Sequence, residues 1–253
     1  MHKTIIVTGA SRGIGHSIAL RFASRNYNVV INSLTGGPLL ELAEQEISEL
    51  QLTASKATKD TKATCLAYAG DVGDPRFVKR MINSVKDELG RIDILVNNAG
   101  ISLIGLVQDM TDEQWQRIIS TNLSSVHYCC QNVIPIMLEN HSGRIINISS
   151  VWGNVGAACE VAYSATKGGV NAYTKALAKE LIPSGISVNA LACGAINTDM
   201  NRFFSKEDLN KLASEIPFGR LGSPDEVAKA VFQLAQMPTY MTGQVITCDG
   251  GWT

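Results

Sequence analysis

The amino-acid sequence predicts an α/β protein with one parallel β-sheet covered on both faces by helices, the doubly wound arrangement. Two observations carry this prediction. Short apolar runs alternate with longer amphipathic segments from end to end, which is the pattern of consecutive β-α-β units. The apolar runs are rich in Val and Ile and mostly lack a polar residue at every second position, as strands buried on both faces do. We therefore expect a sheet of about seven parallel strands.

Length, composition and charge agree with this fold class and exclude others. The chain has 253 residues, 45% of them hydrophobic, which excludes disordered and fibrous proteins. No internal repeat or Ser/Gly-rich linker divides it, so residues 1–253 are expected to form a single domain. The 22 Lys and Arg against 23 Asp and Glu argue against nucleic acid or a membrane surface as a partner, because neutralising phosphates takes a surplus of basic residues.

The elements follow in chain order from this alternation. The apolar runs expected to be strands are Thr4–Val7, Val29–Asn32, Thr64–Ala69, Ile92–Val96, Arg144–Ile148, Ser187–Leu191 and Gln244–Cys248. Helices are expected between them, over residues 13–26, 38–52, 74–89, 111–139, 161–183 and 223–236. Asp74, Thr111 and Ser223 mark three helix starts, because an N-cap residue there precedes proline or acidic residues. The polar, low-complexity segment Thr53–Thr64 is expected to be an elongated surface loop.

Cysteine spacing and the first residues bear on the cellular compartment. The six cysteines contain no CxxC pair, and Cys129 and Cys130 are adjacent, which suits neither a zinc site nor a usual disulfide. We expect reduced core cysteines and no metal. The first apolar run spans Thr4–Val7, too short for the core of about 7–15 residues of a signal peptide, and no run approaches the roughly 18 residues that span a bilayer. These features predict a soluble, cytoplasmic protein.

A glycine-rich turn follows the first strand and opens directly into a helix. Glycines in this context let backbone N–H groups approach a diphosphate at the helix N-terminus, where the helix dipole favours negative charge. The residues expected to hold the dinucleotide here are Gly9, Ser11, Arg12, Gly13, Ile14 and Gly15. The segment also matches the G-x-S-x-G elbow of hydrolases, but too little chain precedes Gly9 to supply the earlier strand and its oxyanion-hole loop.

The end of the second strand indicates which dinucleotide is bound. Folds that use NAD usually place a carboxylate there to bind the ribose 2′-hydroxyl. Here the strand ends in Asn32 and Ser33, so nothing repels a 2′-phosphate. The planar guanidinium of Arg12 is suited to pair with that phosphate. The sequence therefore favours NADP(H) over NAD(H) as cofactor.

Tyr163, Lys167 and Ser150 form the candidate chemical centre. Tyr163 and Lys167 lie four residues apart on an expected helix, so they share one face. A phenol has a pKa of about 10, and a nearby ammonium favours its ionised form, so we expect Lys167 to lower the pKa of Tyr163. Ser150 ends a predicted strand at the carboxyl edge of the sheet, where its hydroxyl can hold a carbonyl oxygen that Tyr163 protonates.

These elements occur together and in order, and the chain resembles the short-chain dehydrogenase/reductase family over essentially its whole length. The matching features are TGASRGIG at 8–15, Asp71-Val72, Asn97-Asn98-Ala99-Gly100, Asn122, Ser150 and the Tyr163/Lys167 pair. The resemblance implies a Rossmann-type fold and transfer of hydride between a nicotinamide and a carbonyl carbon, with the protein orienting the reactants.

The resemblance also implies a role for each matching residue. Tyr163 would donate the proton, Lys167 would bind the nicotinamide ribose, Ser150 would polarise the carbonyl, and Asn122 would fix a water in a proton relay. The implied cofactor contacts are Asp71 and Val72 at the adenine, Asn98, Ala99 and Gly100 along the cleft, and Gly194, Ile196 and Thr198 at the carboxamide. In one departure, Cys193 stands where the family usually has proline, which we expect to loosen the turn without abolishing binding.

Within the family, the chain most resembles 3-oxoacyl-acyl-carrier-protein reductases of fatty acid biosynthesis. The segments that carry this are SRGIG, GRIDILVNNAG, YSATKGGV, INTDM and TGQVITCDGG. The resemblance implies an NADPH-dependent reductase of a 3-oxoacyl thioester, a small-molecule or carrier-bound substrate. It also implies a homotetramer or homodimer that associates through residues 111–139 and 161–183 and the strand Gln244–Cys248.

Other substrates remain open. His141 and Ser184 stand where carrier-binding members often have basic residues, so electrostatic docking of an acidic carrier should be weaker. Residues 149–169 resemble a bacterial reductase of an aminopentanone group on modified elongation factor P, and Glu160 could receive the amine. A sugar, a hydroxysteroid or another small ketone is a further alternative.

The residues expected to line the substrate pocket are Ser150, Trp152, Glu160, Tyr163, Met200, Phe203 and Phe204. A function of another class is a catalytically silent, dinucleotide-binding regulatory or scaffold protein. The complete set of Asn122, Ser150, Tyr163 and Lys167 argues against that class, because a protein that only binds a dinucleotide has no need of all four.

Overall fold

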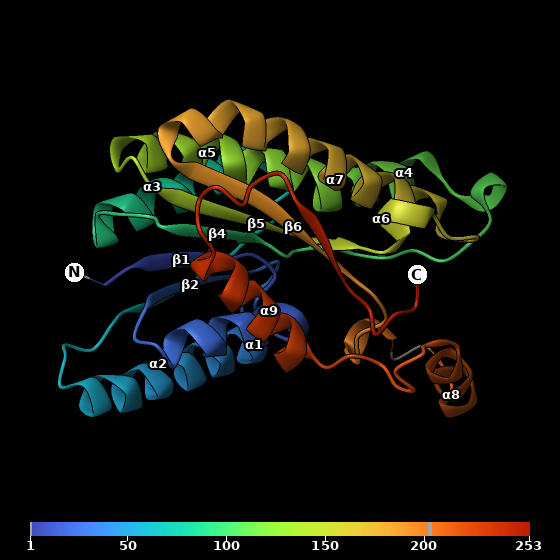
Figure 1. Ribbon diagram of the computed structural model, residues 1–253, viewed down its shortest axis with the longest axis horizontal. Coiled ribbons are helices and arrows are strands. Elements are labelled where there is room, and N and C mark those ends of the chain that lie inside the picture. The colour runs from blue at the N-terminus through green and yellow to red at the C-terminus, as the bar shows by residue number, and fades with distance from the viewer. Residues whose placement is uncertain (1, 202–203) are drawn as a thin grey trace.

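The computed structural model of the chain describes residues 2–201 and 204–253. These residues form one parallel sheet with the strand order β3-β2-β1-β4-β5-β6-β7, the doubly wound, Rossmann-type arrangement predicted from the sequence (Figure 1). The strands are β1 Thr4–Val7, β2 Asn28–Ser33, β3 Cys65–Ala69, β4 Ile94–Asn97, β5 Gly143–Ser150, β6 Ile186–Cys193 and β7 Val245–Cys248. The strand order reverses between β1 and β4, and ligands of such sheets bind at that point, beyond the carboxyl ends of the strands.

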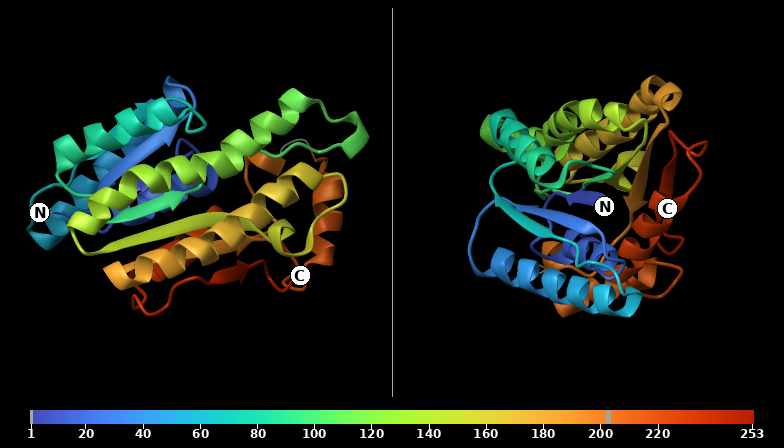
Figure 2. Two further views of the ribbon diagram at one scale, coloured as in Figure 1. Left: turned by 90° about the horizontal axis from the view of Figure 1, so that it is seen from above. Right: turned by 90° about the vertical axis from the view of Figure 1, so that its left-hand side faces the viewer.

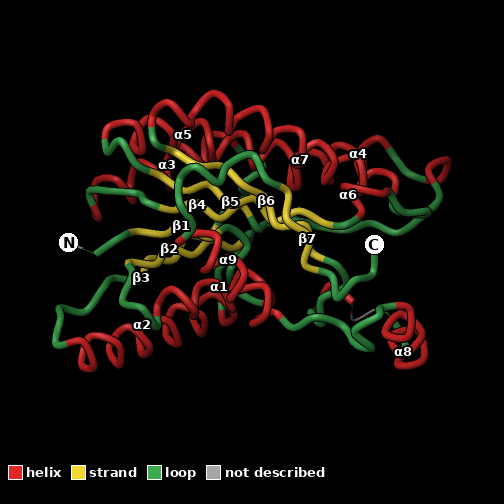
Figure 3. The backbone as a smooth tube through the Cα atoms, in the orientation of Figure 1, coloured by secondary structure: helices red, strands yellow, loops and turns green. Residues whose placement is uncertain are grey.

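Helices cover both faces of the sheet (Figures 1 and 3). The helices are α1 Gly13–Ala23, α2 Pro38–Thr58, α3 Pro75–Leu89, α4 Asp112–Ile119, α5 Ser125–Glu139, α6 Trp152–Val155, α7 Val161–Leu181, α8 Lys206–Glu215 and α9 Pro224–Gln236. Helices α1, α2 and α9 lie on one face, and α3, α5 and α7 lie on the other, as the end-on view of Figure 2 shows. Each face has its own apolar core, one around Phe22 and Val231 and the other around Met81 and Val133.

Three helices begin where the sequence places their N-caps. The Asp74 side chain accepts a hydrogen bond from the backbone N–H of Arg76 at the start of α3. Thr111 and Gln114 form a capping box at the start of α4, and Ser223 forms one with Glu226 at the start of α9. In each box two otherwise unpaired backbone N–H groups are satisfied, which is why the chain turns into a helix at that residue.

The predicted surface loop Thr53–Thr64 is wrong in its first half, because α2 continues to Thr58. Its composition is polar, but Ala54 and Ser55 are buried. Gln51 has no exposed surface, and its side-chain amide donates to the backbone carbonyls of Tyr27, at 2.8 Å, and Thr64, at 3.1 Å. These contacts hold the last turns of α2 against the edge of the sheet and outweigh the weak helical signal of the sequence.

Two short helices and one interruption were not predicted. Helices α6 and α8 lie outside the segments for which we expected helices. The capping box of Ser205 and Asp208 at the start of α8 is a signal that could have located that helix. The segment 111–139, predicted as one helix, contains a π-helical stretch at Ser120–Ser124 between α4 and α5.

The cysteines are all free thiols. Cys129, Cys130 and Cys193 are buried, as predicted, whereas Cys65 and Cys248 are only partly buried. The prediction that all six belong to the core is wrong for Cys159, which is exposed in the loop before α7.

Candidate active site

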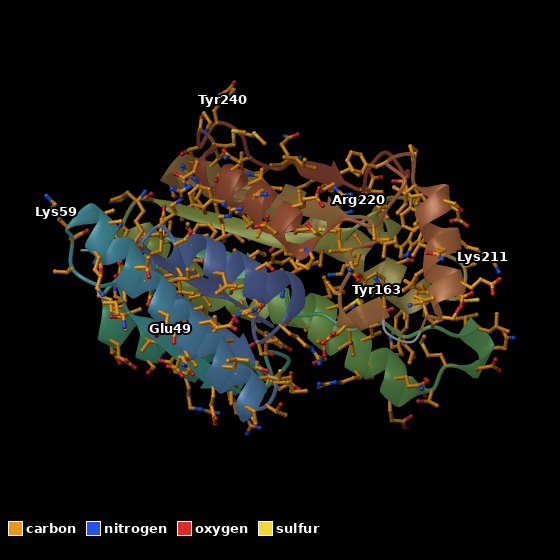
Figure 4. All side chains as sticks on the ribbon, turned by 90° about the horizontal axis from the view of Figure 1, so that it is seen from below. Glu49, Lys59, Tyr163, Lys211, Arg220 and Tyr240 are labelled. Carbon is orange, nitrogen blue, oxygen red and sulfur yellow. The ribbon has the colours of Figure 1, made fainter. Side chains whose placement is uncertain are left out.

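Ser150 and Tyr163 meet at the carboxyl edge of the sheet. Ser150 is the last residue of β5, and Tyr163 lies in the first turn of α7, which returns across that strand. Their hydroxyl groups are hydrogen-bonded to each other. Ser150 is buried, whereas Tyr163 is partly accessible. A side chain that contacts a substrate needs this accessibility. Figure 4 labels Tyr163 toward the side of the molecule that carries α8 with its labelled Lys211.

Lys167 lies one turn further along α7 and is only 4% exposed. Its Nζ donates a 2.8 Å hydrogen bond to the backbone carbonyl of Ile148 and lies 5.6 Å from the centroid of the Tyr163 ring. The spacing of four residues therefore places the two side chains together, as the sequence predicts.

Asn122 joins this group through the π-helical stretch between α4 and α5. A π-turn adds one residue to a helical turn and so re-aims the side chains on it, and such turns are frequent at functional sites. The Asn122 amide nitrogen donates to the Ile101 carbonyl at 2.8 Å and to the Thr166 hydroxyl at 3.2 Å, while its oxygen accepts from the Ile101 N–H at 2.8 Å.

Gly100 lies between Asn122 and Lys167. A Cβ atom on Gly100 would lie 3.4 Å from Oδ1 of Asn122 and 3.6 Å from Nζ of Lys167. The position of Gly100 is therefore close to both side chains, and the structure brings the candidate residues Asn122, Ser150, Tyr163 and Lys167 to one edge of the sheet.

Burial dominates the ionisation of the central pair. Removal from water raises the pKa of Tyr163 above its ordinary value of 10.0, and the negative charge of Glu160 adds to this, while the hydrogen bond with Ser150 acts in the opposite direction. Burial also lowers the pKa of Lys167 to about 8. The expectation that Lys167 lowers the pKa of Tyr163 is therefore wrong for this structure. A phenol that keeps its proton is suited to act as an acid.

The glycine-rich turn has the geometry that a diphosphate requires. Gly9 and Gly13 have positive φ angles of 64° and 59°, which other residues adopt only with strain. No side chain caps the start of α1 and its first turn has no acidic residue, so its N–H groups remain available to a phosphate. A Cβ atom on Gly15 would lie 2.5 Å from Nδ2 of Asn98 and from the Gly9 carbonyl oxygen. These residues fit a dinucleotide.

Asn98, at the end of β4, holds this turn in place. Its amide nitrogen donates to the carbonyls of Thr8, at 2.9 Å, and Gly9, at 3.0 Å. The Thr8 hydroxyl in return accepts from the N–H groups of Asn98 and Ala99, both at 3.0 Å. The side chain of Asn98 therefore shapes the turn, while Ala99 and Gly100 continue along the cleft.

At the end of β2, hydroxyl groups stand where a carboxylate would select NAD. The hydroxyls of Ser11 and Ser33 are hydrogen-bonded at 3.1 Å. Asn32 is buried, and its amide donates to the carbonyls of Tyr68, at 3.2 Å, and Gly70, at 3.0 Å, so it fixes the backbone at this edge.

The residues expected at the adenine lie beyond β3. Asp71 accepts from the N–H of Gly73 at 2.8 Å and forms an ion pair with Arg117 of α4. Val72 is buried. The ion pair between Asp71 and Arg117 is a contact that the sequence reasoning did not anticipate, because the two residues are far apart in the chain and nothing in their local sequence links them.

The loop after β6 contacts the glycine turn from the other side. A Cβ atom on Gly13 would lie 3.6 Å from the side chain of Thr198, and Ile196 is buried. The N–H of Gly194 donates to the Cys248 carbonyl at 3.0 Å, and a Cβ on Gly194 would lie 2.7 Å from Cβ of Asp249, so only glycine fits there.

Cys193, the departure from the family pattern, is paired in register with Ser150 on one side and Cys248 on the other. Burial raises the pKa of its thiol to about 12. A protonated thiol is a poor nucleophile at neutral pH, so a redox role for Cys193 gains no support from its environment.

Two residues expected in the substrate pocket, Trp152 and Glu160, have partners that the sequence did not predict. The rings of Trp152 and Trp252 pack with their centroids 4.8 Å apart. Glu160, the N-cap residue of α7, accepts a 2.7 Å hydrogen bond from the hydroxyl of Ser102. Trp252 and Ser102 were missed from the sequence, since only the folded chain brings the C-terminus and the loop after β4 to this place.

Two further pocket residues lie beyond β6. Met200 is 43% exposed and Phe204 is partly buried. Phe203, also expected in the pocket, lies outside the described residues.

The part of the chain that the structure describes has neither a metal-binding cluster nor a membrane-spanning helix. Among residues 2–201 and 204–253, no group of three or more His, Cys, Asp or Glu side chains is placed to hold a metal ion. Within the same ranges no helix combines the length and the apolarity needed to cross a bilayer.

Comparison with known proteins gives one consistent result. Residues 3–209 match the family model for short chain dehydrogenases. The chain is 38% identical to the uncharacterized oxidoreductase YmfI of Bacillus subtilis (strain 168), over 100% of this chain and 99% of that protein. It is 40% identical to the 3-oxoacyl-[acyl-carrier-protein] reductase FabG of Staphylococcus aureus (strain Mu50), over 99% and 98% of the two chains. The corresponding FabG of Chlamydia trachomatis serovar D is 38% identical, over 99% and 97%.

Proposed function

The chain belongs to the short-chain dehydrogenase family and is an oxidoreductase acting on carbonyl or hydroxyl groups, and from this premise we propose that it reduces a 3-oxoacyl thioester with NADPH. The observation that carries the proposal is the cluster of Ser150, Tyr163, Lys167 and Asn122 at the carboxyl edge of the sheet, beside a glycine turn that fits a dinucleotide.

The mechanism follows from what these side chains can do. The nicotinamide, when bound, supplies the hydride. The Ser150 hydroxyl holds the carbonyl oxygen, and the raised pKa of Tyr163 keeps a proton on its hydroxyl for donation to that oxygen as charge develops. Lys167, whose pKa is lowered to about 8, still carries its proton at neutral pH and keeps a positive charge near the ring.

Asn122 has a positioning role in this mechanism. It ties the loop after β4 to α7 by bonding to Ile101 and Thr166. The position of Gly100, which is close to both side chains, places Asn122 near Lys167.

Three features support NADP(H) as the cofactor. No carboxylate stands at the end of β2, the hydroxyls of Ser11 and Ser33 lie together there, and Arg12 follows Ser11 as the N-cap residue of α1. Hydroxyl groups and a guanidinium are donors that a 2′-phosphate accepts from, whereas a ribose 2′-hydroxyl is usually held by a carboxylate.

The thioester assignment is supported by two FabG proteins whose names state that they reduce 3-oxoacyl-[acyl-carrier-protein]. His141 and Ser184 offer no fixed positive charge to an acidic carrier, so we expect the acyl chain and thioester to contribute more to recognition than the carrier does.

A second candidate substrate is a ketone that carries an amine. The environment of Glu160 favours this candidate. Glu160 is partly buried, its carboxylate accepts a hydrogen bond from Ser102, and its negative charge acts on Tyr163. An ammonium group that pairs with this carboxylate would be oriented by an interaction that a neutral acyl chain cannot make.

We also propose that the enzyme self-associates through α5 and α7. A groove on these helices is lined by apolar and aromatic side chains, among them Leu123, Tyr128 and Tyr173. Light scattering coupled to size-exclusion chromatography tests this: a dimer or tetramer is expected, and a monomer at micromolar concentration would contradict it.

The substrate proposal is tested by NADPH oxidation with a panel of carbonyl compounds. The panel contains acetoacetyl thioesters of the carrier protein, of coenzyme A and of N-acetylcysteamine, together with an amino ketone, a keto sugar and a ketosteroid. We expect the highest kcat/KM with a thioester, and only a modest advantage for the carrier-bound form. A highest value with the amino ketone would replace the first proposal with the second.

A further inference from the structure

We propose that Asp199 is a specificity-determining residue that competes with the cofactor's 2′-phosphate for the guanidinium of Arg12. The inference rests on the proposed use of NADP(H), and it concerns how strongly this chain favours NADPH over NADH. It is carried by the position of an acidic side chain across the cofactor cleft from the glycine turn.

Arg12 and Asp199 belong to two segments that flank the cofactor. Arg12 immediately precedes α1, and Asp199 begins a short 3₁₀ turn, Asp199–Asn201, in the loop after β6. Nη1 of Arg12 lies 3.6 Å from Oδ2 of Asp199, and each side chain is about half exposed. The guanidinium that we assign to the 2′-phosphate therefore already has an anionic partner supplied by the protein.

The base of the loop that carries Asp199 is tied to the segment before α9, because the N–H of Asn197 donates to the Gly222 carbonyl at 2.8 Å. The Asn201 amide donates a 2.7 Å hydrogen bond to the Ile196 carbonyl, and the N–H of Asn201 donates to the Thr198 carbonyl at 3.0 Å. The Thr198 side chain is also in contact range of Gly13 in the glycine turn. The short 3₁₀ turn therefore presents Asp199 beside Arg12.

A cavity of about 340 Å³ lies between the glycine turn, the start of α2 and this loop. Its ionisable lining side chains, among the described residues, are Arg12, Asp199, His16 and Glu46. His16 and Glu46 are paired with each other at 3.0 Å. Arg12 is therefore left with Asp199 as its anionic neighbour in this cavity, and a 2′-phosphate that reaches Arg12 meets the Asp199 charge there.

The balance of these interactions determines the sign of the effect. An exposed ion pair contributes little to stability, so a phosphate with two negative charges can displace Asp199 from Arg12. The displaced carboxylate then lies close to that phosphate, and like charges repel. Asp199 therefore weakens binding of ligands that carry the 2′-phosphate and leaves ligands that lack it almost unaffected.

Asp199→Asn tests this in the full-length protein by direct binding titration, without turnover. The Kd values of NADPH and NADH are measured by the fluorescence of the reduced nicotinamide, and those of 2′,5′-ADP and 5′-AMP by calorimetry. We expect NADPH and 2′,5′-ADP to bind about three- to tenfold more tightly to the variant, and NADH and 5′-AMP to change less than about twofold. Asp199→Glu, which keeps the charge, should retain the wild-type values.

Asp225→Asn is the matched control. Asp225 pairs with Arg21 near the other end of α1 at 3.0 Å, so this variant makes the same charge change on an ion pair of the same helix, away from the phosphate. It should leave all four Kd values unchanged. In an Arg12→Ala background, Asp199→Asn should also lose its effect, because the guanidinium for which the two anions compete is gone.

The outcomes separate this inference from the cofactor proposal. If the wild type binds NADPH no more tightly than NADH, the NADP(H) proposal fails, and the Asp199 inference is judged on 2′,5′-ADP against 5′-AMP alone. The inference is overturned if Asp199→Asn leaves the ratio of the Kd values of 2′,5′-ADP and 5′-AMP unchanged, or if it weakens the binding of all four ligands together. Either result would mean that Asp199 does not compete for Arg12. The inference is also overturned if Asp225→Asn tightens the binding of NADPH and 2′,5′-ADP as much as Asp199→Asn does, since the effect would then come from net charge.

Discussion

Nζ of Lys167 donates a 2.8 Å hydrogen bond to the backbone carbonyl of Ile148, two residues before Ser150 on the same strand. This bond fixes the ammonium to the β5 backbone, so the separation of Lys167 from Ser150 is set by strand geometry. Lys167 is nearly completely buried. It takes part in none of the salt bridges found among the described residues. Burying the charged ammonium of Lys167 without an ion-pair partner therefore lowers the stability of the folded protein.

Lys167→Met should stabilise the protein while abolishing catalysis. Burial lowers the pKa of Lys167 from 10.5 to about 8, a difference of about 2.5, and each unit corresponds to about 1.4 kcal/mol. We expect the free energy of unfolding at pH 7, measured with urea, to rise by about 1–3 kcal/mol.

The pH dependence of that gain has a defined sign. Between pH 8 and about 10.5 the unfolded chain keeps the Lys167 proton that the folded chain has lost, so this group adds stability to the wild type as pH rises. The gap between Lys167→Met and wild type should therefore narrow across that window. A gap that widens, or a variant less stable at pH 7, contradicts the account of Lys167.

Catalysis should decline when Lys167 loses its proton. Because the pKa of Lys167 is lowered to about 8 while burial raises that of Tyr163, the lysine is the first of the pair to deprotonate. We expect kcat/KM for carbonyl reduction to fall as pH rises through about 8, measured in buffers of constant ionic strength. A profile that stays flat to pH 10 would show that the lysine charge has no part in the reaction.

Trp252→Ala should disturb the packing of Trp152, a residue expected in the substrate pocket. Aromatic pairs contribute about 0.5–1.5 kcal/mol beyond their buried area, so we expect kcat/KM to fall about three- to tenfold, mainly through KM. The contact of Trp152 and Trp252 at 4.8 Å should also give an exciton signal in far-ultraviolet circular dichroism that the variant lacks. The control is Trp115→Phe, because Trp115 lies on the exposed side of α4. This variant should keep both the wild-type kcat/KM and the exciton signal. Loss of the signal in the control would refute the assignment.

Glu160→Gln distinguishes the two candidate substrates. Hydrogen bonds to charged groups contribute about 1.5–3 kcal/mol, so removing the carboxylate should lower kcat/KM for an amino ketone at least tenfold. A neutral acetoacetyl thioester should change less than about threefold. The comparison uses both substrates on the same preparation, and an equal loss for both would mean that Glu160 supports the site only through Ser102.

The sequence predicted the features that depend on local order along the chain. The glycine turn, the Tyr163–Lys167 spacing and the strand ending at Ser150 each sit within one element or one connection, so their geometry follows from helix and strand periodicity. Parallel strands then bring their carboxyl ends to one edge, which places the candidate residues together.

What the sequence could not give depends on tertiary contacts. The last turns of α2 form because Ala54 and Ser55 are buried by segments distant in the chain. Trp252 reaches Trp152 only through the path of the C-terminal segment. The direction of the Tyr163 pKa depends on how far water is excluded, and the spacing to Lys167 carries no information about that.

The central claim is that Tyr163 delivers the proton in an NADPH-dependent carbonyl reduction, and Tyr163→Phe tests it most directly, because phenylalanine keeps the ring and removes the hydroxyl. The measurement is NADPH oxidation with acetoacetyl thioester, beside the Kd of NADPH for both proteins. General acid catalysis contributes about 10²–10⁴ in rate, so the variant should lose at least about 100-fold in kcat while binding NADPH as the wild type does. A variant that retains the wild-type rate, or a wild type that binds NADPH but oxidises it with no carbonyl of the panel, would contradict the account.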